Sequence, residues 1–149
     1  FGKREIMIPV FPEIDRIPEE ANLFLNLSSA RRVLNYSNDI LELKNILGGT
    51  VFAEGVPEKH SLYLYSKVED LNKFLIGPAS VGLLIPKVLK LGAVGGVDPR
   101  QLMESALFDK GNVAVMSSSG GMTNEIIELL QIRDLGFLLL YPLEEKDFQ

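Results

Sequence analysis

The chain has 149 residues, 46% of them hydrophobic, which predicts a globular domain with a sizeable core. Its 15 basic and 20 acidic residues are mixed along the sequence, and the lack of a Lys/Arg block argues against binding to nucleic acid. Because the sequence has no cysteine, no signal peptide and no apolar run of membrane-spanning length, we expect a cytoplasmic protein without disulfides, thiolate chemistry or membrane contact.

Short apolar runs bounded by Gly, Pro or Ser recur along the chain. They predict strands over 6–11, 22–27, 50–55, 73–78, 112–117 and 136–141. The runs are nearly continuous, which is typical of parallel strands covered on both faces. Helical periodicity predicts helices over 29–47 (with a stop at the glycines 48–49), 57–72 and 122–132. In the last of these, one face carries Met122, Ile126, Leu129 and Leu130.

Strands and helices alternate, which predicts an α/β fold with a Rossmann-like parallel sheet and helices on both of its faces. Residues 79–111 break this alternation, and we expect an irregular excursion or a small hairpin there. No stretch rich in Pro, Gly or Ser divides residues 1–134, so we expect one domain over this range and a following segment or tail over 135–149. The lack of an initiator Met indicates a piece of a longer polypeptide, or a processed one.

Ligands of open parallel sheets bind at the carboxyl ends of the strands, where the pattern places three candidate segments. They are "NLSSAR" (26–31), "FAEGVPE" (52–58) and "SSSGGMTNE" (117–125). The first two also fit ordinary strand-to-helix turns, with Ser28 or Ser29 as a helix cap and Pro57 in a first helical turn. Arg31 and Arg32 are the only adjacent arginines; from a helix, one of them could reach a phosphate or simply be exposed.

The segment 117–125 is the best candidate for an anion site. Its glycines let a ligand approach the backbone, and the free amides of a first helical turn favour negative charge. Ser119 or Thr123 could add hydroxyl donors. A plain turn with a serine cap explains the same residues equally well, so the residues alone leave both interpretations open. The spacing matches neither a nucleophile elbow nor a P-loop.

No catalytic residue can be assigned from these patterns. His60 is the only histidine, and a lone histidine on a helix usually packs or lies at the surface. Without a second histidine or any cysteine we expect no metal site. The glycines of "GAVGG" (92–96) lack the spacing of a dinucleotide-binding loop, and we expect a tight turn there.

Five motifs, taken in their order along the chain, resemble those of a known family. They are "EIMIPVF", "AEGVPE", "LIGPASVG", "LKLGAVGG" and "GNVAVMSSSGGMTNE". They resemble the CoA-binding region of ATP-citrate lyases, within the wider group of succinyl-CoA synthetase α subunits and related acyl-CoA synthetases. "GPASVG" and "SGGMTNE" are closer to the lyases than to the synthetases, which usually have G-P-N-x-x-G and S-G-T-x-x-x-E. Arg31 stands where a similar lyase segment also has Arg.

The resemblance implies two sets of binding residues. Coenzyme A would be bound by the loop 26–29 and by the end of the next strand, mainly through backbone atoms. The residues of this first set are Ser28, Ser29, Phe52, Ala53 and Glu54. The helix opened by "SGGM" would face the phosphorylated histidine of the family and bind phosphate or the citrate-derived substrate. This second set comprises Ser119, Gly120, Gly121, Met122 and Thr123.

The implied reaction converts citrate, CoA and ATP to acetyl-CoA and oxaloacetate through phosphohistidine and citryl-CoA. ATP and Mg²⁺ would be bound by an ATP-grasp part and the histidine would lie in a following domain, so these parts of the same oligomeric enzyme are the expected partners. The chain starts after the family's first strand and Gly-rich CoA loop. It has Ser118 where the family has Arg, and "LLLYPLEEKDF" where the family has G-G-D-x-x-P-G. We therefore do not expect this chain alone to complete the reaction.

Two alternatives stay open. The loss of the first CoA loop and of the Arg before Ser119 would suit a non-catalytic interaction or regulatory module that keeps the fold. An acyl-CoA ligase subunit of the succinyl-CoA synthetase type would share the motifs, but would not explain "GPAS" and "SGGM".

Overall fold

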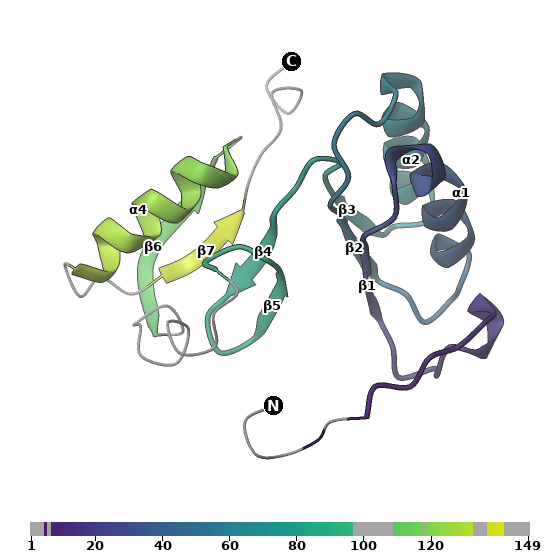
Figure 1. The fold of residues 1–149 in the computed structure, drawn as a ribbon, viewed down its shortest axis with the longest axis horizontal. Coiled ribbons are helices and arrows are strands. Elements are labelled where there is room, and N and C mark those ends of the chain that lie inside the picture. The colour runs from purple at the N-terminus through teal and green to yellow at the C-terminus, as the bar shows by residue number, and fades with distance from the viewer. Residues whose placement is uncertain (1–4, 6, 97–108, 118, 133–136, 142–149) are drawn as a thin grey trace.

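The computed structural model describes residues 5, 7–96, 109–117, 119–132 and 137–141 (Figure 1). In chain order its elements are the 3-10 helix η1 (Ile14–Arg16), β1 (Leu23–Asn26), α1 (Ala30–Leu41), β2 (Gly48–Val51), α2 (Glu58–Asp70), β3 (Phe74–Ile76), β4 (Gly82–Ile85), β5 (Leu89–Gly92), β6 (Lys110–Met116), α4 (Gly120–Ile132) and β7 (Phe137–Tyr141). This succession of strands and helices confirms the predicted α/β class.

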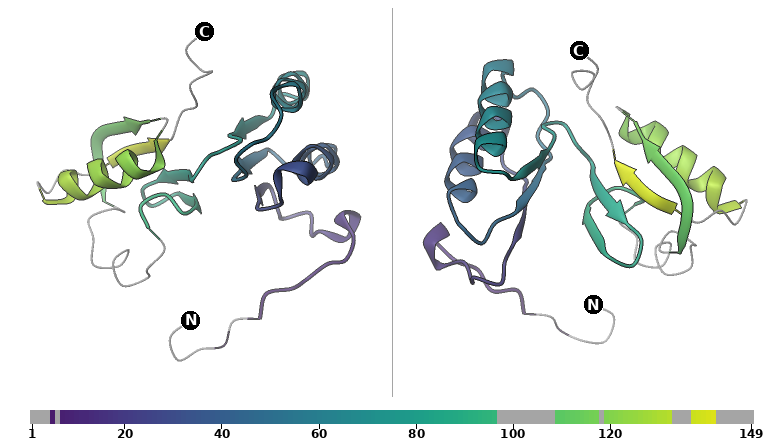
Figure 2. Two further views of the ribbon diagram at one scale, coloured as in Figure 1. Left: turned by 45° about the horizontal axis from the view of Figure 1, so that its top comes forward. Right: turned by 180° about the vertical axis from the view of Figure 1, so that it is seen from behind.

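Strands β1, β2 and β3 form a three-stranded parallel sheet in this order. The two crossovers are α1 and α2, which contact each other and cover the same face of the sheet (Figure 2). Two crossover connections of the same handedness place their helices on the same face of a sheet when both move to the next strand in the same direction. Here the chain moves from β1 to β2 and then from β2 to β3, which is the same direction across the sheet. The predicted Rossmann-like parallel unit is confirmed, with its two crossover helices on a single face.

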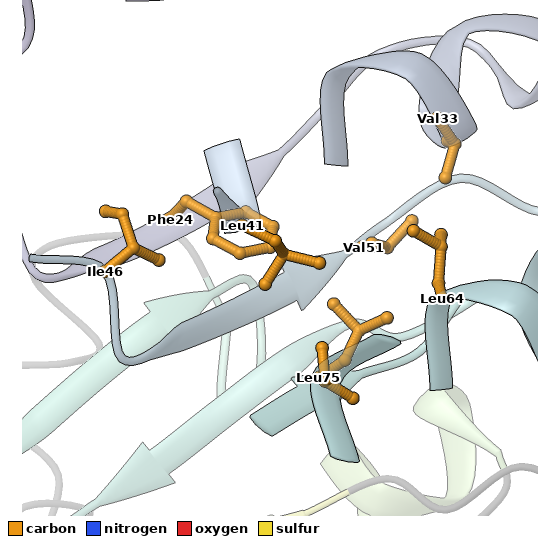
Figure 3. Close-up of a cluster of buried hydrophobic side chains, with 8 residues drawn as sticks. Phe24, Val33, Leu41, Ile46, Val51, Leu64 and Leu75 are labelled. Atoms are coloured by element: carbon orange, nitrogen blue, oxygen red, sulfur yellow. The ribbon is translucent and has the colours of Figure 1, made fainter. Parts of the chain in front are cut away.

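The core of this unit lies between the sheet and its two helices. It contains side chains that are at most 8% exposed: Phe24, Val33, Leu41, Ile46, Val51, Leu64, Val68 and Leu75. Figure 3 labels seven of them, which come from all three strands, both helices and the segment before β2. Burial of each such apolar side chain is worth about 1.5–3 kcal/mol, so the cluster holds the sheet against its two helices.

Gly48 and Gly49 begin β2, whereas the sequence predicts them as the stop of a helix over 29–47. The helix already ends at Leu41. A Cβ atom on Gly49 would lie 2.4 Å from the backbone oxygen of Phe24 on the neighbouring strand. The glycines are therefore needed for the close packing of β2 between its neighbours, and the strand starts earlier than expected.

The remaining strands form a second sheet in the order β5-β4-β7-β6. β4 and β5 make an antiparallel hairpin, which confirms the small hairpin expected within 79–111. β7 runs parallel to β6 and antiparallel to β4, and α4 contacts β6. The expected strands thus divide between two sheets, and continuous apolar runs reveal neither which strands pair nor in which direction.

The buried side of α4 agrees only in part with the predicted one. Thr123 and Ile127 are 0% and 3% exposed, and Ile126 and Leu130, both of the predicted face, are partly buried against the same cluster. Met122 and Leu129, predicted to share the apolar face, are 56% and 62% exposed. Residues four apart lie on one side of a helix, so the buried stripe is centred on Thr123 and Ile127, one position later than expected.

Residues 7–11 have no regular secondary structure, so the predicted strand over 6–11 is wrong. Met7, Ile8 and Val10 are 89%, 79% and 89% exposed. No described strand pairs with this segment or with the outer edge of β1. An apolar run forms a strand only where a neighbour satisfies its backbone groups, and the described part of the chain supplies none.

Thr50 in β2 is fully buried, and its hydroxyl has no hydrogen-bond partner among the described residues. Valine has a similar shape and lacks the hydroxyl that would otherwise stay desolvated and unpaired. We expect Thr50→Val to raise the free energy of unfolding by about 1 kcal/mol, measured by urea denaturation. A loss of stability would show that the hydroxyl is paired in the native protein.

Candidate functional site

The carboxyl ends of β1, β2 and β3 lie along one edge of the parallel sheet. We call the residues there the strand-end site; they comprise 26–29, 52–54 and 77–80. Phe52 N donates to Asn26 O at 3.0 Å, and Ala79 N donates to Ala53 O at 2.9 Å. The structure therefore brings together the two loops that the resemblance assigns to CoA, and adds the turn after β3.

Asn26 orders the loop after β1. Its side chain is buried, and its Oδ1 accepts hydrogen bonds from Ser28 N at 2.9 Å and Ser28 Oγ at 2.6 Å. Its Nδ2 donates to Ser37 Oγ at 2.9 Å. The hydroxyl of Ser28 therefore holds the loop in shape, while Ser29 takes the N-cap position of α1.

The start of α1 lacks a side-chain cap. Ser29 makes no capping hydrogen bond through its side chain, and the first turn has no acidic residue. Arg31 and Arg32 are both exposed, but only Arg32 has a side-chain partner among the described residues, since its Nη1 donates to Tyr36 Oη at 3.2 Å. Arg32 N already donates to Ser29 O, whereas the amides of Ala30 and Arg31 have no hydrogen-bond partner among the described residues. Together with the exposed Arg31 guanidinium, these two amides form a donor set that suits a phosphate group.

The turn 77–80 is absent from the sequence-predicted site residues, yet it braces the loop after β2. Ser80 N donates to Val51 O at 3.2 Å, and Tyr65 Oη donates to Gly77 O at 3.0 Å. Gly77 has a φ of +82°, and a Cβ there would lie 2.4 Å from Val51 O, so glycine is required. The Gly-Pro pair signals a turn, but this contact depends on the tertiary fold.

Residues 119–123, which we call the α4 turn, begin α4 after β6. The predicted serine cap is present, since Ser119 Oγ accepts from Met122 N at 3.3 Å. Ser119 O accepts both Thr123 N at 2.9 Å and Thr123 Oγ1 at 2.8 Å. Thr123 is fully buried, so its hydroxyl braces the turn instead of facing outward. Ser118, at the position of the family's Arg, lies outside the described residues.

Gly120 and Gly121 stand in different surroundings. A Cβ on Gly120 would lie 2.7 Å from Val81 Cγ1, whereas a Cβ on Gly121 would have no heavy atom within 4 Å. Gly121 is also not one of the described glycines whose φ angle is positive. Neither packing nor backbone conformation therefore requires glycine at 121, and the space above it leaves the backbone accessible.

Val81 connects the two predicted sites. It directly follows Ser80 of the strand-end site, and its side chain faces Gly120 of the α4 turn. The α4 turn therefore lies next to the end of the strand-end site, although the two belong to different sheets. The sequence places both after strands but does not indicate this contact.

Within the described ranges, no group of three or more His, Cys, Asp or Glu side chains could bind a metal ion. His60 lies in the first turn of α2, where its backbone N donates to Pro57 O at 2.8 Å. None of the helices that the structure describes is long and apolar enough to cross a membrane.

No family model matches the chain. Among curated proteins it is 32% identical over 133 residues to the ATP-citrate synthase of Homo sapiens, covering 87% of this chain and 12% of that protein. It is also 32% identical over 133 residues to the probable ATP-citrate synthase subunit 1 of Schizosaccharomyces pombe, covering 87% of this chain and 22% of that protein. The chain thus spans less than a quarter of the length of these relatives.

Solved structures agree with the sequence comparison. ATP citrate lyase from Methanothrix soehngenii, in complex with citrate and coenzyme A, matches with a TM-score of 0.77 and 30% identity over 85% of this chain and 20% of that one. A dinucleotide-forming acetyl-coenzyme A synthetase from Ca. Korarchaeum cryptofilum has a TM-score of 0.65 at 18% identity, covering 95% of this chain and 30% of that one, which shows a shared fold. The predicted resemblance is confirmed.

Proposed function

From its homology to a segment of ATP-citrate synthases, we propose that this chain is the CoA-binding and phosphate-binding part of an enzyme that acts as an ATP-citrate lyase. Coenzyme A binds at the strand-end site, and citrate or phosphate binds at the α4 turn. The contact between Val81 and Gly120 carries this proposal, because it joins the two sites. A thiol at one site could thereby reach an acyl group held at the other.

The residues of the strand-end site fit the chemistry of coenzyme A. Its phosphate groups would accept hydrogen bonds from the exposed Arg31 side chain, the first-turn amides of α1 and the Ser29 hydroxyl. The half-buried Phe52 and Ala53 offer backbone and apolar surface along the same edge. When bound, coenzyme A supplies the thiol nucleophile, and these residues hold its position.

The α4 turn fits an anionic substrate. The amides of Gly120 and Gly121 lie at the N-terminus of a 13-residue helix, where the helix dipole favours a phosphate or carboxylate group. Ser119 and Thr123 hold the turn in shape. ATP, Mg²⁺ and the phosphorylated histidine belong to the ATP-grasp part and the phosphohistidine domain, the partners with which this chain would complete the reaction.

Titration calorimetry with coenzyme A tests the strand-end site. We expect Arg31→Ala to weaken binding at least about ten-fold, equivalent to about 1.4 kcal/mol, because the exposed guanidinium is a phosphate partner. Arg32→Ala is the matched control, since Arg32 is adjacent and already bonded to Tyr36, and its effect should stay within about two-fold. Equal effects of both substitutions would contradict the assignment of Arg31.

A non-catalytic interaction module is the second candidate. The exposed apolar side chains of Met7, Ile8 and Val10 favour it, because they offer apolar surface to another protein. The outer edge of β1, on which no described strand lies, would offer backbone hydrogen-bonding groups to the same partner. A folded chain that binds neither coenzyme A nor citrate would support this candidate over the first.

A further inference from the structure

The loop 92–96, which follows the β4–β5 hairpin, is held against α4. The amide hydrogens of Ala93 and Val94 are both donated to Val81 O, at 2.7 and 3.1 Å, and the Val94 side chain is fully buried. Gly95 N donates to Asn124 Oδ1 at 3.1 Å. One end of the loop is thus fixed by Val81, and the other by a side chain of the helix.

The same loop offers few free donors to a ligand. The amide of Gly96 is donated to Ala93 O at 3.0 Å, which completes the use of the amides from residue 93 to 96. At its start, Lys90 Nζ donates to Gly92 O at 2.9 Å, and burial lowers the pKa of this lysine. The loop therefore acts through its shape and position rather than as an anion-binding nest.

Asn124 is a poor choice for the helix itself, since asparagine costs roughly 0.6 kcal/mol relative to alanine in a helix interior. Its side chain is exposed, so packing does not require it. Among the described residues, the side-chain hydrogen bond that Asn124 makes is the one it accepts from Gly95 N. Val81 contacts both the loop and Gly120, so the loop lies beside the α4 turn.

We propose that Asn124 is a positioning residue: by accepting the Gly95 amide hydrogen it holds the loop 92–96 as a wall beside the α4 turn and so selects a ligand that extends beyond a single phosphate. This role rests on the proposed function of the α4 turn. A tricarboxylate such as citrate carries two further carboxylate groups beyond the one that would lie on the turn, and the loop would bear on these. Inorganic phosphate is smaller and needs only the turn.

The test compares Asn124→Ala with Asn124→Asp in the full chain. Amide hydrogen exchange followed by NMR should speed up at least about ten-fold at Gly95 in N124A, while Val94, bonded to Val81 O, stays protected. N124D keeps the acceptor oxygen and should retain the protection of Gly95. By calorimetry, N124A should bind citrate about ten-fold more weakly and inorganic phosphate within two-fold of the wild type.

The outcomes separate this role from the proposed function. Unchanged exchange at Gly95 in N124A would overturn the contact, and an equal loss of citrate and phosphate affinity would reduce Asn124 to general support of the turn. Unchanged citrate affinity with faster Gly95 exchange would also overturn the role while leaving the α4 turn as a site. A wild-type chain that binds neither anion would overturn the proposed function, and the positioning role with it.

Discussion

Gly49→Ala should lower the free energy of unfolding by about 3 kcal/mol, because the added Cβ would lie 2.4 Å from the Phe24 backbone oxygen. The atoms that it meets are the backbone and the ring of Phe24, so relief requires β1 and β2 to move apart. Since the core between this sheet and its helices depends on that spacing, we expect a large shift of the urea midpoint with little change in m-value.

Gly121→Ala is the matched control for this prediction. Its Cβ would have no neighbour within 4 Å, and alanine is a better helix former than glycine. The control should therefore be neutral or more stable by up to about 1 kcal/mol. If both variants unfolded at the wild-type midpoint, the close approach of β2 to β1 would be wrong.

The first sheet could be predicted from the sequence because its signals are local. Apolar runs locate β1 and β3, and Pro57 precedes the helical pattern that becomes α2. The end of α1 could not be predicted from pattern alone. Lys73 Nζ donates to the carbonyl oxygens of Leu41 and Leu43, at 2.6 and 2.7 Å, and this contact spans about thirty residues of sequence.

The division into two sheets depends on pairing, which local patterns do not encode. A run such as that of β7 is equally compatible with a parallel or an antiparallel neighbour, and it has one of each. The same limit explains residues 7–11, where strand propensity is high and no described partner exists.

The position of the candidate site could be predicted because each loop directly follows a strand. The use of individual hydroxyls could not, because it depends on partners made close by folding. Ser28 Oγ is committed to Asn26, and Thr123 Oγ1 to Ser119 O. The contact of Gly95 with Asn124 likewise joins residues far apart in the sequence.

Gly121→Leu should abolish measurable binding of phosphate and citrate, with a loss of at least about a hundred-fold, equivalent to about 2.7 kcal/mol. An anion held by helix N-terminal amides must come to within about 3 Å of the backbone nitrogen. Glycine at 121 leaves that space free, and nothing in the described fold uses it. Leucine would fill the space with apolar atoms and also desolvate the amides.

Two measurements distinguish a lost site from a lost fold. The urea midpoint of G121L should remain close to that of the wild type, because the side chain extends into open space. Coenzyme A affinity should also persist, because Arg31 and the start of α1 are unchanged. Retained citrate and phosphate binding in folded G121L would refute the anion site and leave Gly121 without a function. Loss of anion binding together with retained CoA binding would show that the two ligands occupy separate subsites, which the fold places on either side of the contact between Val81 and Gly120.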